Sequence, residues 1–241
     1  MPVNILDLAV AANTVYNFQK GRGNDEAAFK TAEAARRSPP GFQVIFTHED
    51  IDVGFFGAVY QEKHSSEYIV AYRGTAVGSS SSGQMAGGKN LKTDIALYTI
   101  ESLPAGIRAA KLLLKQARVL LAGQKPILCG HSLGGAIATI VAVEKGLPCC
   151  AFNAPTVSKM VRGGIIHGPY VRVANEDLSA VEKQIVNFNL QWDPISKSSK
   201  AVGKVIKLPA TLATGGHSQD KVVANIKSSK YASMPFFDLV G

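Results

Sequence analysis

Gly130-His131-Ser132-Leu133-Gly134-Gly135 stands between two apolar runs, at residues 126–129 and 136–143. The pattern G-x-S-x-G in that setting predicts a sharp turn from a strand into a helix, with the serine at its tip. A serine there has a strained backbone, and glycines two residues to either side let the strand and the helix pass so closely. The turn therefore presents the Ser132 hydroxyl as a candidate nucleophile, whereas we expect the neighbouring His131 side chain to point away and pack.

The segments that flank this turn alternate between helix and strand patterns. Apolar residues recur at helical spacing over residues 104–121 and 133–145, and short apolar runs typical of strands cover 127–129 and 148–152. Helix, strand, helix, strand in this order predicts an α/β fold with a mostly parallel central sheet and helices on both of its faces.

The remaining apolar runs add strands and helices to this sheet. Upstream strands are predicted at 42–47, 54–62 and 67–72. The connections between them are short, which favours an antiparallel arrangement of these N-terminal strands. Downstream strands are predicted at 170–173, 185–190 and 203–208. Further helices are predicted at 5–16, where Asn4 is a suitable N-cap, at 25–37 and at 220–226.

The chain of 241 residues shows no repeat and no linker that would divide it. We therefore expect residues 1–241 to form a single domain, with N-terminal helices in 1–40 and a flexible Ser/Gly loop at 76–90. Its cysteines are odd in number and lie in apolar runs, which indicates reduced core residues and argues against a disulfide framework. They are Cys129, Cys149 and Cys150.

The formal net charge is +8, and lysines gather in the C-terminal third of the chain. The sequence lacks the interleaving of arginine and aromatic residues that is typical of nucleic-acid binding, so we expect no nucleic-acid partner. If the positive charge serves a partner, we expect an anionic membrane surface. The first residues lack the basic and apolar regions of a signal peptide, and no apolar run is long enough to span a membrane. We expect a cytoplasmic protein, or one exported by a route that needs no signal peptide.

A serine hydroxyl needs a base to take its proton, and the base needs a carboxylate to fix its tautomer. In the α/β-hydrolase fold the acid and then the histidine follow the serine, each on a loop at the C-terminal end of a strand. Two histidines lie downstream of Ser132, and only His217 leaves room for an acid and another strand before it, unlike His167. We expect His217 to be the base.

The expected acid is Asp193, which stands directly before a proline where the apolar run 185–190 has ended. Three other acidic residues are alternatives. We expect Glu176 and Asp177 to begin a helix, and Asp220 is a helix-start acid close to His217.

An oxyanion needs at least two fixed N–H donors. Leu133 follows the nucleophile and supplies the first. The second is expected from Thr75, because Arg73-Gly74-Thr75 ends the strand predicted at 67–72 and Gly74 allows a turn there.

These segments together resemble the class 3 lipases, a family with the α/β-hydrolase fold. The resemblance covers roughly residues 60–225 and rests on four motifs in the family's order: Ala71-Tyr72-Arg73-Gly74-Thr75, Gly130-His131-Ser132-Leu133-Gly134-Gly135, Asp193-Pro194-Ile195 and His217-Ser218. Asp94 corresponds to an aspartate that the family carries after its oxyanion segment. Where fungal members have an amphipathic lid helix, this chain has the polar loop at 76–90.

The resemblance implies hydrolysis of a carboxylic ester in a lipid by a Ser-Asp-His triad, in the manner of a lipase or phospholipase. Two alternatives remain open: a short-chain esterase without a membrane role, and a hydrolase-fold module that binds lipid without catalysis. We expect no cofactor, and no metal because the histidines lack ligand spacing.

Overall fold

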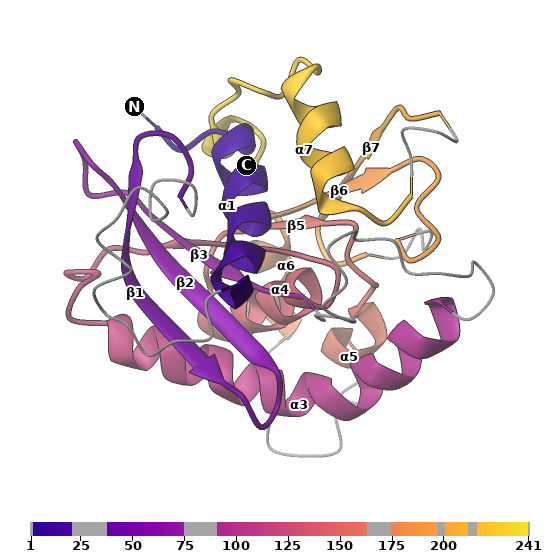
Figure 1. The fold of residues 1–241 in the computed structure, drawn as a ribbon, viewed down its shortest axis with the longest axis horizontal. Helices are drawn as coiled ribbons and strands as arrows, with labels where there is room; N and C mark the ends of the chain where they lie inside the picture. The colour runs from indigo at the N-terminus through magenta and orange to yellow at the C-terminus, as the bar shows by residue number, and fades with distance from the viewer. Residues whose placement is uncertain are drawn as a thin grey trace.

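The computed structural model describes residues 2–20, 38–74, 91–162, 175–196, 201–211 and 216–240. Its centre is a seven-stranded sheet in which the strands lie in chain order (Figure 1). The strands are β1 (Phe42–Asp50), β2 (Phe55–Glu62), β3 (Tyr68–Tyr72), β4 (Ile127–His131), β5 (Cys149–Phe152), β6 (Ile185–Leu190) and β7 (Lys204–Leu208). The pairs β1–β2 and β2–β3 are antiparallel, and every pair from β3 to β7 is parallel. The predicted fold class is confirmed.

Helices cover both faces of the sheet. On one face α1 (Ile5–Thr14) lies beside α7 (Gln219–Lys227), as Figure 1 shows. On the other face α3 (Leu91–Ala117) packs against α4 (Leu133–Lys145), and α4 also contacts α6 (Asn175–Glu182). The short elements are η1 (Val15–Lys20), α5 (Ser158–Arg162) and η3 (Phe236–Asp238).

Strand β3 shows how this layering follows from the sequence. Successive side chains of a strand point to opposite faces, and a strand buried on both faces is apolar throughout. Val70 and Tyr72 enter the core under α3 and α4, whereas Ile69 and Ala71 enter the core under α1 and α7. The continuous apolar runs therefore place these strands in the middle of a three-layer structure.

Helix α3 differs from the expectation of a helix over 104–121. It begins at Leu91 and ends at Ala117, so that Pro104 lies inside it. A proline inside a helix removes one N–H donor and crowds the carbonyl of the preceding turn, but Leu103 before it and Ile107 and Ala110 beyond it are all buried. Packing of that apolar face outweighs the local preference of proline for the first turn.

Several expected elements fall outside the described residues, namely the helix at 25–37, the loop at 76–90 and the strand at 170–173. Within the described ranges, no helix has both the length and the apolar character that a membrane span requires.

The two ends of the described chain meet on the α1 face. Asn4 caps α1 with a reciprocal capping box to Asp7, and it forms a β-bridge with Pro235. Phe236 is fully buried, and its backbone N–H donates to the Val3 carbonyl at 2.9 Å. The C-terminal segment thus docks on the core.

Candidate active site

The turn after β4 has the backbone that the pentapeptide predicts. Ser132 has φ 56° and ψ −128°, in the region that residues with a Cβ rarely adopt. A Cβ on Gly130 would collide with the backbone of Gly134, and one on Gly134 would collide with the Tyr72 carbonyl. Glycine is therefore required at both positions, because α4 starts in contact with β3 and β4.

The structure brings together the three side chains that the sequence singles out from distant segments. His217 Nε2 lies 2.7 Å from Ser132 Oγ, and His217 Nδ1 lies 2.8 Å from Asp193 Oδ1. The Asp193 side chain is fully buried, and that of His217 is 9% exposed. In this arrangement Nδ1–H donates to the carboxylate, which leaves Nε2 as the acceptor for the serine hydroxyl.

The turn after β6 holds the Asp193 carboxylate. The Ile195 N–H donates to Oδ1 at 3.3 Å and the Ser196 N–H donates to Oδ2 at 2.8 Å. The Asp193 N–H itself donates to the Leu190 carbonyl at 3.0 Å, where β6 ends. The carboxylate therefore has hydrogen-bond partners on both oxygens and a fixed direction toward His217.

The alternative residues lie elsewhere. Asp220 is exposed and accepts a hydrogen bond from Asn13 Nδ2 at 3.0 Å. Glu176 and Asp177 are in the first turn of α6, and neither their side chains nor any part of His167 is within the described structure.

The expected oxyanion donors are described only in part. Leu133 is the first residue of α4, and its N–H has no acceptor among the described residues. Thr75 lies outside the described residues, but Gly74 before it packs directly on the turn: a Cβ there would lie 2.7 Å from the His131 carbonyl and 3.3 Å from Ser132 Cβ. The chain therefore leaves β3 immediately beside Ser132.

Arg73, the neighbour of Gly74, anchors the end of β3. Its guanidinium lies 5.3 Å from the centre of the Phe56 ring, and its Nη2 donates to the Gly54 carbonyl at 3.4 Å. Arg73 is thus directed toward Gly54 and β2.

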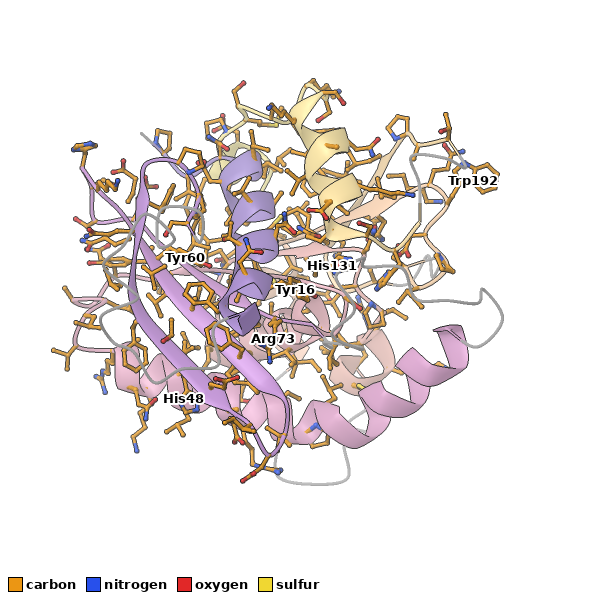
Figure 2. The ribbon with its side chains drawn as sticks, viewed as in Figure 1. Tyr16, His48, Tyr60, Arg73, His131 and Trp192 are labelled. Carbon is orange, nitrogen blue, oxygen red and sulfur yellow. The ribbon has the colours of Figure 1, made fainter. Side chains whose placement is uncertain are left out.

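Tyr16 belongs to the site, although its sequence context did not indicate it. The Gly74 N–H donates to the Tyr16 hydroxyl at 3.0 Å, and this hydroxyl lies 3.3 Å from His131 Nδ1 (Figure 2). Burial raises the pKa of Tyr16 to about 12, so the phenol stays neutral at physiological pH. Tyr16 joins η1 to the strand end that precedes Thr75.

His131 is packed as expected, but it does not point away from the site. Its ring centre lies 4.7 Å from that of His217, and the two ring planes are tilted by 38°, so a second imidazole packs beside that of His217. Burial, and next the charge of His217, hold the pKa of His131 well below its ordinary value of 6.5. His131 therefore stays neutral, and two adjacent imidazolium cations are avoided.

This burial predicts a pH dependence of stability. Above pH 6.5 His131 is neutral in both the folded and the unfolded state. Below pH 6.5 the His131 side chain binds a proton in the unfolded chain but stays neutral in the folded protein. The free energy of unfolding should therefore decrease as the pH is lowered below 6.5. His131 should contribute up to about 1.4 kcal/mol to this decrease per pH unit. Urea unfolding of wild type and His131→Gln between pH 7.5 and 5 measures this, and parallel curves for the two proteins would contradict it.

The cysteines take no part in this arrangement. All three are free and buried. Burial raises the pKa of Cys149 to about 12 and that of Cys129 well above its ordinary value, so these thiols are protonated and inert at neutral pH. Within the described ranges, His, Cys, Asp and Glu side chains form no group of three or more that could hold a metal ion.

Comparison with known proteins places this geometry in context. A family model described as "Phospholipase-like: Tle-like phospholipase domain" matches residues 7–233. Among solved structures, the mono- and diacylglycerol lipase of Aspergillus oryzae is similar, with a TM-score of 0.53 and 16% identity over 87% of this chain and 82% of that chain. None of the curated proteins compared with the chain matches it.

Two further lipases share the fold. A mutant form of MDLA from Penicillium cyclopium has a TM-score of 0.53 and 15% identity, with 86% of this chain and 79% of that chain covered. Lip2 lipase from Yarrowia lipolytica has a TM-score of 0.51 and 15% identity, with 84% and 77% covered. The resemblance to class 3 lipases is therefore confirmed. At these low identities the solved structures show a shared fold and nothing further.

Proposed function

Since the chain belongs to the family of Tle-like phospholipase domains and is therefore a carboxylic ester hydrolase of lipids, we propose that Ser132, His217 and Asp193 form its catalytic triad. We further propose that it hydrolyses phospholipids at an anionic membrane surface.

The proposed reaction is an acyl transfer through the serine. The Ser132 oxygen attacks the ester carbonyl carbon while His217 Nε2 takes its proton, and Asp193 stabilises the imidazolium that forms. The N–H groups of Leu133 and Thr75 hold the oxyanion of the tetrahedral intermediate. Its collapse releases the alcohol, which takes the proton from Nε2, and water then hydrolyses the acyl-enzyme by the same steps.

One observation carries this proposal: two short hydrogen bonds, 2.7 and 2.8 Å, link a strained serine to a buried carboxylate through one imidazole. These bonds join residues 85 and 24 positions apart in the chain. A strained serine backbone and a buried carboxylate each reduce the stability of the folded protein. That both contact the same histidine favours a catalytic role for these residues over a purely structural one.

The surface around β7 and α7 supports a membrane as the site of action. Its exposed lysines include Lys204 and Lys207 on β7, Lys227 at the end of α7 and Lys230 just beyond it. Trp192, directly before the proposed acid, is 46% exposed. Lysines attract anionic lipid head groups, and tryptophan favours the membrane–water interface.

Vesicles of defined composition test the substrate and the surface together. We expect fatty acid release from phosphatidylglycerol vesicles to exceed that from phosphatidylcholine vesicles, and to fall at least about tenfold between 0.1 and 1 M salt as the charges are screened. Trp192 is the only tryptophan of the chain. Its fluorescence should shift to the blue when Ser132→Ala protein binds anionic vesicles at low salt.

A soluble p-nitrophenyl ester is the control, because its turnover should not respond to salt in this way. Preference for short soluble esters, with no response to vesicles, would instead identify a short-chain esterase. Vesicle binding without fatty acid release, and without fluorophosphonate labelling of Ser132, would identify a lipid-binding module.

A further inference from the structure

Asn153, the residue directly after β5, has an unusual backbone in a fully buried position. Its φ is 45° and its exposed fraction is zero. Asparagine accepts such a backbone more readily than most residues with a side chain. The preceding Phe152 accepts a hydrogen bond from the Ser132 N–H at 3.0 Å, so the strained turn at Asn153 lies beside the strained turn at the serine.

Both ends of the Asn153 carboxamide are used. Oδ1 accepts a hydrogen bond from the Leu190 N–H at 2.8 Å, and Nδ2 donates to the Gly216 carbonyl at 3.2 Å. The Asn153 backbone N–H also donates to the Phe188 carbonyl at 3.0 Å. One side chain thus connects the end of β6 with the segment that leads into α7.

The two partners of this carboxamide are the residues that hold the acid and the base. The Leu190 carbonyl accepts the hydrogen bond from the Asp193 N–H, and Gly216 directly precedes His217. We propose that Asn153 is a positioning residue that sets the distance between the Asp193 carboxylate and the His217 imidazole. This inference rests on the proposed function, because it concerns the same triad.

Asparagine has the chemistry that this position needs. It offers an acceptor and a donor on one rigid group, and it tolerates φ 45°. Aspartate has the same shape but no donor, so it would keep the bond from the Leu190 N–H and set a negative charge against the Gly216 carbonyl. Glycine would relax the backbone and remove both side-chain bonds.

The test compares Asn153→Asp with wild type on a soluble p-nitrophenyl ester, at a temperature where both proteins are folded. We expect kcat to fall roughly 10- to 100-fold, the cost of a misplacement on the order of 1 Å at a reacting centre. We expect KM to stay within about threefold, because substrate contacts are unchanged. The rate of fluorophosphonate labelling of Ser132 should fall in parallel with kcat.

Asn187→Asp is the matched control. Asn187 is a buried asparagine on β6 whose amide donates to the carbonyls of Val202 and Lys204, so its change costs stability without touching the two triad segments. Asn187→Asp should lower the melting temperature and leave kcat close to that of wild type. An equal loss of kcat in both variants, or an effect of Asn153→Asp on KM alone, would overturn the proposal.

Asn153→Gly carries the test if Asn153→Asp does not fold, and its kcat should fall by at least as much. If neither variant folds, Asn153 is required for folding itself and the positioning role is refuted. The proposed function is judged separately: fluorophosphonate labelling of wild-type Ser132 does not depend on any Asn153 variant.

Discussion

Ser132→Ala is expected to lower kcat for a p-nitrophenyl ester and for phospholipid vesicles by on the order of 10⁶-fold. The hydroxyl is the only group at the turn that lies within hydrogen-bond distance of His217 Nε2 among the described residues, at 2.7 Å. Alanine removes this oxygen and leaves the backbone bond from the residue 132 N–H to the Phe152 carbonyl in place. The loss should therefore be chemical, and circular dichroism should show a folded protein.

Ser132→Gly is the matched partner of this variant. It should be equally inactive, but glycine accepts φ 56° without strain, so it should be about 1 kcal/mol more stable than Ser132→Ala. Steady-state rates and urea unfolding measure the two effects independently. Undiminished turnover by Ser132→Ala would refute the assignment of the nucleophile.

Asp193→Asn should lower kcat by on the order of 10⁴-fold. The carboxylate accepts hydrogen bonds at Oδ2 from the Ser196 N–H and at Oδ1 from His217 Nδ1. The amide of Asp193→Asn has only one oxygen. Because the backbone N–H of Ser196 is fixed and needs an acceptor, this oxygen takes the place of Oδ2, and the amide N–H₂ group faces His217. Nδ1 then becomes an acceptor, the proton moves to Nε2, and the imidazole can no longer take the proton of Ser132.

The control is Asp220→Asn, which removes an exposed carboxylate three residues beyond His217. Its bond from Asn13 connects α7 to α1 without touching the triad, so its kcat should stay within about twofold of wild type. A loss of less than tenfold in Asp193→Asn would point to Asp177 as the acid.

The elements with strong periodicity could be predicted from the sequence to within a few residues. The helix at 133–145 and the strand at 185–190 have the bounds expected from their apolar patterns. The start of α3 is predicted wrongly, because Pro104 is typical of the first turn of a helix and the predicted boundary lies there. Leu103 and Ile107 are buried on either side of Pro104, so packing on both sides of the proline keeps the helix continuous.

The site divides in the same way. Ser132, Asp193 and His217 stand in recognisable motifs, and the structure brings their side chains together. Tyr16 and Asn153 act through hydrogen bonds to segments far away in the chain, so no spacing within the sequence indicates them. The one signal in the sequence for Asn153 is an asparagine after a buried strand, because asparagine adopts a positive φ more often than most other residues with a side chain.

The order of the strands has a consequence for synthesis on the ribosome. Every strand pairs with the one made just before it, so the sheet can grow by one strand at a time as the chain emerges. Helix α1 is made before these strands, whereas its neighbour α7 is made after them and is joined to it by a hydrogen bond from Gln219 Nε2 to the Ala9 carbonyl at 2.9 Å. His217 directly precedes α7, so the nascent chain can complete the proposed triad only after the strands from β1 to β7 have been made.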